Sequence, residues 1–190
     1  MKTKVIASVI VASALLQGCM TAAVVTVVGG AAVVNDNRSI GKLIDDQKIE
    51  LDAHAKLSDD QGLSDNANIQ VVSVNGKVLI VGQAKNTYLR DSAIKILNEV
   101  DGIDHIYDQI RISNLTSLST RTNDIWLTSK VKAALLGSDV VDATNIKVVT
   151  ENGEVFLMGL IDNKQADEAV EVARHISGVN RVFKMFEYIQ

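Results

Sequence analysis

The sequence contains no proline and a single cysteine, and only 4% of its 190 residues are aromatic. Without proline, its linkers cannot be stiff polyproline spacers and must be soft, polar segments. The lone cysteine, Cys19, excludes an internal disulfide. The sequence also offers no Ser-His-Asp order, no phosphate-binding loop and no metal-ligand spacing among its three histidines. We therefore expect no cofactor, no metal site and no enzymatic activity.

Charge is modest and mostly negative. The formal net charge is −4, and the first 18 residues carry Lys2 and Lys4 but no acidic residue. Without those 18 residues, 17 basic and 23 acidic residues remain, a net charge of −6. A net acidic chain is a poor candidate for binding nucleic acid. Binding to any anionic surface would have to depend on a local basic patch.

The N-terminus combines a short basic start, an apolar run and the motif Leu15-Leu16-Gln17-Gly18-Cys19. This pattern resembles the lipobox of bacterial lipoproteins, and the apolar run is too short to span a bilayer as a helix. We predict a signal peptide at residues 1–18, lipidation of Cys19, and a lipidated N-terminus and linker at 19–45. By resemblance to lipoprotein sorting, Met20 after the cysteine favours the outer membrane. The alternatives are a secretory signal with an unrelated cysteine, or one long membrane anchor.

An internal repeat organises the rest of the chain. The segment from Ser73 to Gly82 matches the segment from Thr150 to Gly159 at an offset of 77 residues. We predict one domain at 46–112 and a second at 124–190. The joining segment, 113–123, is rich in Ser, Thr and Asn, which is typical of a linker.

Each repeat predicts the same α+β unit, with the order α-β-β-α-β. An amphipathic helix precedes a strand, and an Asn-Gly pair then supplies a type I′ hairpin turn. The second strand, residues 78–81 in the first repeat, is apolar throughout and should be covered on both faces. A second helix begins near Asn86 or Asn163, and a glycine, Gly102 or Gly178, follows its end. The hairpin and the helical crossover together predict a mixed three-stranded sheet carrying two helices.

This repeated unit, with its Asn-Gly hairpin and its glycine turn, resembles the BON domain. Two such units behind a lipobox resemble the dual-BON-domain outer-membrane lipoproteins of Gram-negative bacteria. The resemblance covers nearly the whole chain and is strongest over residues 123–160. It implies a non-enzymatic protein, lipid-anchored on the periplasmic face of the outer membrane, that supports membrane integrity and is recruited to the division site. It also implies binding of an anionic, phosphatidylglycerol-like phospholipid through the second domain and a link to the β-barrel assembly machinery.

The first helix of the second repeat is the candidate site. At 100° per residue, Leu127, Val131 and Leu135 share one face, which should point to the core. The residues on the opposite side or flanking it are Trp126, Lys130, Lys132, Ala133, Leu136 and Gly137. An exposed tryptophan beside lysines is typical of a membrane-interface helix, and the resemblance places the family's lipid-binding helix here. From the residues alone, packing of Trp126 against the other domain or the linker is the better interpretation; the resemblance favours lipid.

Two other functions stay open. The chain could be an adaptor whose main ligand is a protein, bound through the acidic first domain or a free sheet edge. It could also be a cell-wall hydrolase, although no catalytic set supports this. The acidic pairs Asp45-Asp46 and Asp59-Asp60 are interpreted as helix caps and solvated residues. The first helix of the first repeat, from Asp46 to Ala53, should expose an acidic face. We expect no nucleic acid partner and no small-molecule substrate.

Overall fold

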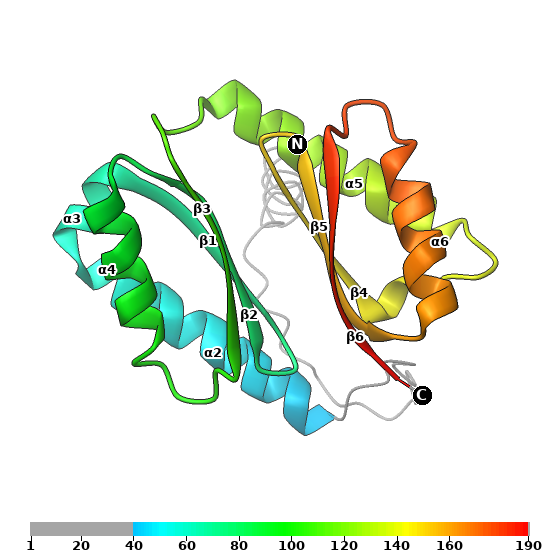
Figure 1. The fold of residues 1–190 in the computed structure, drawn as a ribbon, viewed down its shortest axis with the longest axis horizontal. Coiled ribbons are helices and arrows are strands. Elements are labelled where there is room, and N and C mark those ends of the chain that lie inside the picture. Colours follow the sequence, from blue (N-terminus) through cyan, green and yellow to red (C-terminus); the bar gives the residue numbers. More distant parts are fainter. Residues whose placement is uncertain (1–39, 190) are drawn as a thin grey trace, which may run out of the picture. The chain divides into compact units, whose positions relative to one another are not determined.

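The computed structural model describes residues 40–189 (Figure 1). The first repeat contains α2 (Ile40–Asp59), α3 (Gln61–Asn66), β1 (Ala67–Val74), β2 (Lys77–Ala84), α4 (Thr87–Leu97) and β3 (His105–Ile112). The second contains α5 (Leu118–Leu136), the short 3-10 helix η1 (Ala143–Asn145), β4 (Ile146–Glu151), β5 (Glu154–Ile161), α6 (Asn163–Arg174) and β6 (Arg181–Tyr188). The predicted α-β-β-α-β order is confirmed in both repeats.

The two sheets have the predicted mixed topology, in the orders β1-β2-β3 and β4-β5-β6. The hairpin strands pair antiparallel, and the third strand of each sheet pairs parallel to the central one. Both turns have positive φ angles, 53° and 77° at Asn75 and Gly76 and 51° and 75° at Asn152 and Gly153. These angles are the left-handed values that a type I′ turn needs.

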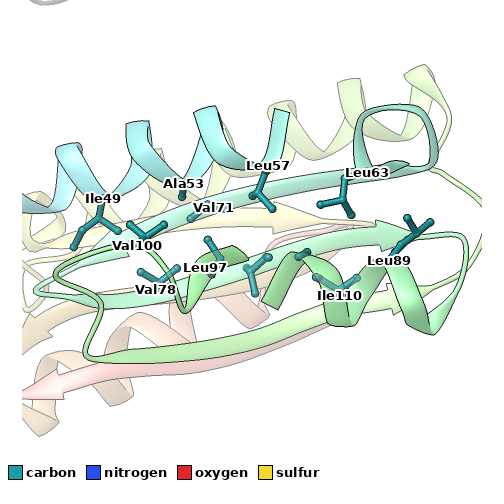
Figure 2. Close-up of a cluster of buried hydrophobic side chains, with 13 residues drawn as sticks. Ile49, Ala53, Leu57, Leu63, Val71, Val78, Leu89, Leu97, Val100 and Ile110 are labelled. Carbon is teal, nitrogen blue, oxygen red and sulfur yellow. The ribbon is translucent and has the colours of Figure 1, made fainter. Parts of the chain in front are cut away.

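Each sheet carries its helices on one face (Figure 1). The side chains between helices and sheet form a separate core in each repeat, and Figure 2 shows that of the first repeat. In the first repeat, α2 contributes Ile49, Ala53 and Leu57 to this core, and β2 contributes Val78 and Ile80. The second repeat builds an equivalent core between α5, α6 and its own sheet. The helical spacing in the sequence is therefore the spacing of the buried face.

A third cluster joins the two repeats through the sheet faces that the helices leave uncovered. It contains Val72, Val74, Leu79, Val81, Val149, Phe156, Met158 and Met185. Leu79 and Phe156 come from the two central strands and are 0% and 1% exposed. This cluster explains why the central strands are apolar at consecutive positions: their alternate residues face different cores.

A buried aspartate holds each hairpin turn. The carboxylate of Asp124, in α5, accepts hydrogen bonds from the backbone N–H groups of Asn152 (2.8 Å) and Gly153 (2.9 Å). Asp46, in α2, binds the first turn in the same way. The interpretation of Asp46 as a solvated residue is therefore wrong, since its side chain is buried and ties the first helix to the turn.

Five local features differ from expectation. The sequence pattern missed α3, which Asp60 caps, and η1, which Asp142 caps. The N-cap of α6 is Asp162 and Asn163 is its first residue, whereas Asn86 does cap α4. Two segments assigned to linkers, residues 40–45 and 118–123, instead form the starts of α2 and α5. The hydroxyl of Ser117 accepts a hydrogen bond from the N–H of Thr120 and caps α5.

Candidate membrane-binding helix

Helix α5 is anchored on one side and open on the other. Leu127, Val131 and Leu135 are buried against the second sheet, as the periodicity predicts, and Asp124 is fixed by the hairpin turn. These four contacts lie along one face and set the rotation of the helix about its axis. The opposite face is consequently directed to solvent.

The predicted site residues lie on or beside that open face. Trp126 is 59% exposed and Leu136 is 68% exposed. Ala133, Lys132 and Gly137 are also exposed, and Gly137 is the C-cap of the helix. An indole with this exposure is not packed between the two repeats. The predicted lipidation site, Cys19, lies outside the described residues.

Lys130 is half-buried because its ammonium lies over the indole of Trp126, 3.6 Å from the ring centroid. The same ammonium is 3.4 Å from the carbonyl oxygen of Ser177, to which it donates a hydrogen bond. A cation over the face of a tryptophan is attracted by the ring quadrupole. Lys130 therefore covers part of an aromatic side chain that is otherwise open to solvent.

The sequence pattern missed two large apolar side chains on the same face. Leu118 is 74% exposed and Ile125 is 70% exposed. The sequence analysis did not place Leu118 on a helix face, because residues 113–123 were predicted to be a linker. Ile125 stands eleven residues before Leu136, about three helical turns, so the two side chains lie on the same face. The predicted face was centred on Trp126, from which Ile125 is rotated by about 100°, and it therefore left Ile125 out. Together with Trp126 and Leu136 they make an apolar surface along most of α5.

The equivalent helix of the first repeat provides an internal comparison. Counting from the buried aspartates, Lys48 and Asp52 of α2 occupy the positions of Trp126 and Lys130. Lys48 and Asp52 form an ion pair of 3.2 Å in place of the cation–π contact. The sequence predicted an acidic exposed face for α2. That face is not purely acidic, because Ile44 is 63% exposed. It nevertheless lacks an exposed aromatic residue beside lysines.

None of the helices among residues 40–189 is long and apolar enough to cross a membrane. An apolar helix face bordered by lysines can lie in the interface between headgroups and acyl chains.

The two αββαβ units define a tandem BON-domain protein, and a family model described as BON domain matches residues 45–114 and 123–190. The chain is 36% identical over 190 residues to the outer membrane lipoprotein DolP of Haemophilus influenzae, covering 98% of this chain and 96% of that protein. The chain belongs to the BON-domain family, in the branch that includes DolP.

Two further relatives carry other names. A 21 kDa hemolysin of Actinobacillus pleuropneumoniae is 42% identical over 155 residues, covering 82% of this chain and 80% of that protein. Osmotically-inducible protein Y of Escherichia coli K12 is 28% identical over 156 residues, covering 80% of this chain and 77% of that protein.

Proposed function

We propose that this chain is a non-enzymatic outer-membrane lipoprotein that binds anionic phospholipid through the exposed face of α5. In this proposal Cys19 carries the lipid anchor on the periplasmic side, and the protein supports outer-membrane integrity at the division site. Membership of the DolP branch supports the anchor and the location. The observation that carries the lipid contact is Trp126, an exposed indole on a rigid helix with a lysine against its face.

Magnitudes explain why an anchor and a lipid-binding helix work together. Insertion of a large apolar side chain contributes roughly 2–3 kcal/mol. Each lysine near an anionic surface contributes about 1 kcal/mol. The total of about 4–5 kcal/mol corresponds to an affinity near millimolar, too weak to hold a soluble protein on a membrane. A lipid tether raises the effective concentration of the helix at the bilayer, so that such a weak contact can orient the protein.

The test uses the mature chain from residue 19 with Cys19→Ser, so that no acyl group contributes. Trp126→Glu should abolish binding to phosphatidylglycerol micelles without changing the circular dichroism spectrum. Tyr88→Glu is the matched control, since Tyr88 is 79% exposed on α4 of the first repeat. It should bind as the parent does. Equal binding by Trp126→Glu and the parent would end the assignment of lipid contact to α5.

A second candidate is an adaptor of outer-membrane protein assembly, with lipid contact secondary. The observation that favours it is the pair Ile44 and Leu51, which are 63% and 64% exposed and stand seven residues apart on α2. Residues at this spacing lie on one helix face. Amide chemical shifts in a micelle titration separate the two candidates. Shift changes confined to α5 favour lipid binding, and the absence of shift changes in α5 favours the adaptor.

A further inference from the structure

A groove with a cavity volume of about 490 Å³ runs beside the open face of α5. Its lining joins residues far apart in the sequence. Arg121, Ile125 and Lys132 come from α5, Val149 from β4, and Asn68 and Gln70 from β1 of the first repeat. The groove therefore needs both repeats, although the apolar face of α5 belongs to the second alone.

Within the described part of the chain, two cations without an ion-pair partner line the groove and are available to an anionic ligand. Its two cations are Arg121 and Lys132, and within residues 40–189 neither has a carboxylate oxygen within 4.0 Å. Its two carboxylates are already bonded inside the protein. Asp124 accepts two backbone N–H groups of the hairpin turn, and Glu151 accepts the side-chain amide of Gln83. Burial also raises the pKa of Glu151.

The walls of the groove fit a ligand that is part polar and part apolar. Val149 is a buried part of the lining, and Ile125 belongs both to the lining and to the exposed face of α5. Gln70, on β1 of the first repeat, is exposed, so its side-chain amide can reach a ligand in the groove. A guanidinium and an amide are both suitable donors to phosphate oxygens. Arg121 and Lys132 are eleven residues apart, about 16 Å along the helix, so they approach a ligand from opposite ends of the groove.

We propose that this groove receives the phosphate ester headgroup of an anionic phospholipid whose acyl chains lie against the exposed face of α5. The inference rests on the proposed function and adds a role for the first repeat: Gln70 on β1 lies next to the headgroup. The membrane surface thereby contacts both repeats at once. Selection between anionic and neutral lipids then depends on the groove, and insertion depends on the apolar face.

Charge changes at Gln70 test the inference in the mature chain with Cys19→Ser. The probe is vesicles of phosphatidylglycerol mixed with phosphatidylcholine, with binding followed by cosedimentation. Gln70→Glu should weaken binding and Gln70→Lys should strengthen it, each on the order of fivefold, since one charge is added close to the phosphate. The matched controls are Gln47→Glu and Gln47→Lys, because Gln47 is exposed on α2 and does not line the groove. Both controls should change binding much less.

A soluble arm separates a lipid headgroup from a free phosphate ester. sn-Glycerol 3-phosphate at millimolar concentration should shift the NMR signals of Arg121 and of the Gln70 side-chain amide. These NMR signals could shift while vesicle binding is the same for Gln70, Gln70→Glu and Gln70→Lys. That result would indicate a site for free phosphate esters and would overturn the inference.

The remaining outcomes distinguish the two proposals. If the Gln70 and Gln47 variants behave alike while Trp126→Glu abolishes binding, the groove is not the headgroup site but α5 still binds lipid. If Trp126→Glu binds normally, the proposed function itself fails. Because Gln70 is exposed, both of its variants should retain the circular dichroism spectrum of the parent, which excludes unfolding as the cause.

Discussion

The ammonium of Lys130 lies 3.6 Å from the centroid of the Trp126 ring, one helical turn away on α5. In solution this contact shields part of the indole from water. A membrane changes the competition, because an anionic headgroup offers the ammonium a stronger partner than the ring quadrupole does. Release of Lys130 to a headgroup would free the indole to enter the interface. Under the proposed function, this pair would link the charge of the lipid to the insertion of the aromatic side chain.

Lys130→Met tests this link, because methionine keeps an apolar side chain beside the indole and removes the charge. Binding to phosphatidylglycerol vesicles should fall by on the order of fivefold, the contribution of one lysine at an anionic surface. Binding to phosphatidylcholine vesicles should not fall. Trp126 is the single tryptophan of the chain, so its fluorescence emission reports insertion directly. A loss of equal size on both lipids would show that Lys130 supports α5 without sensing lipid charge.

The buried aspartates should be major contributors to stability. Removing the carboxylate of Asp124 leaves two backbone N–H groups of the hairpin turn without their acceptor. Asp124→Ala should lower the free energy of unfolding by about 2–4 kcal/mol, since each orphaned buried donor costs about 1–3 kcal/mol. Urea denaturation followed by circular dichroism measures this change.

Asp46→Ala should show a loss of similar size, because Asp46 also accepts a hydrogen bond from the hydroxyl of Ser73 at 2.7 Å. Its neighbour Asp45 is exposed and provides the control. Asp45→Ala should stay within about 0.5 kcal/mol of the parent, as surface substitutions usually do. Comparable losses at both positions would contradict a specific role of the buried carboxylate.

These aspartates also show where sequence reasoning reached its limit. The hairpins and the buried helix faces could be predicted because Asn-Gly pairs and four-residue spacings act locally. The bond from Asp46 to Gly76 crosses 30 residues, and nothing in the neighbourhood of Asp46 indicates it. An aspartate beside a second aspartate therefore looked solvated.

The candidate site could likewise be predicted only in part from the sequence. Trp126 and its lysines could be found on a helical wheel, because all of them belong to one helix. The groove could not be found in this way, since Gln70 and α5 line it together only because the two sheets pack on each other. The apolar pattern of β2 indicated that its second face was covered, but not by what.

The packing of sheet on sheet should couple the stabilities of the two repeats. Phe156 is 1% exposed, and its ring stacks on that of Phe183 with centroids 4.8 Å apart. Phe156→Ala should cost about 3–5 kcal/mol, typical of a large cavity in a core. Because Phe156 shares its cluster with Leu79, amide exchange should accelerate in β2 of the first repeat as well as in β5.

Tyr88→Ala is the control for this coupling, since Tyr88 is exposed on α4 and lies outside the shared cluster. Its amide exchange pattern should match that of the parent. Acceleration limited to the second repeat in Phe156→Ala would mean that the repeats are stable independently of each other.

Two glutamates at the junction of the repeats should give opposite pH dependences. The side-chain amide of Asn75 donates a hydrogen bond to Glu187 (2.9 Å), and Lys77 forms an ion pair with the same carboxylate (3.1 Å). Both contacts lower the pKa of Glu187. Its contribution to stability is therefore present above the unfolded pKa, about 4.3, and is lost as the pH falls through the folded value. Glu187→Gln should be less stable than the parent at pH 7, by under about 1 kcal/mol for a partly exposed pair.

Burial raises the pKa of Glu151, so its contribution to stability has the opposite pH dependence to that of Glu187. The stabilising contribution is complete below the unfolded pKa and disappears as the pH rises through the folded value. Glu151→Gln should therefore be more stable than the parent at pH 7, and Gln83 can still donate its hydrogen bond to the new amide oxygen. Urea denaturation at pH 7 and at pH 3.5 measures both variants, and both differences should shrink at the lower pH. A Glu151→Gln variant less stable than the parent at pH 7 would show that the bond to Gln83 outweighs the cost of burying the charge.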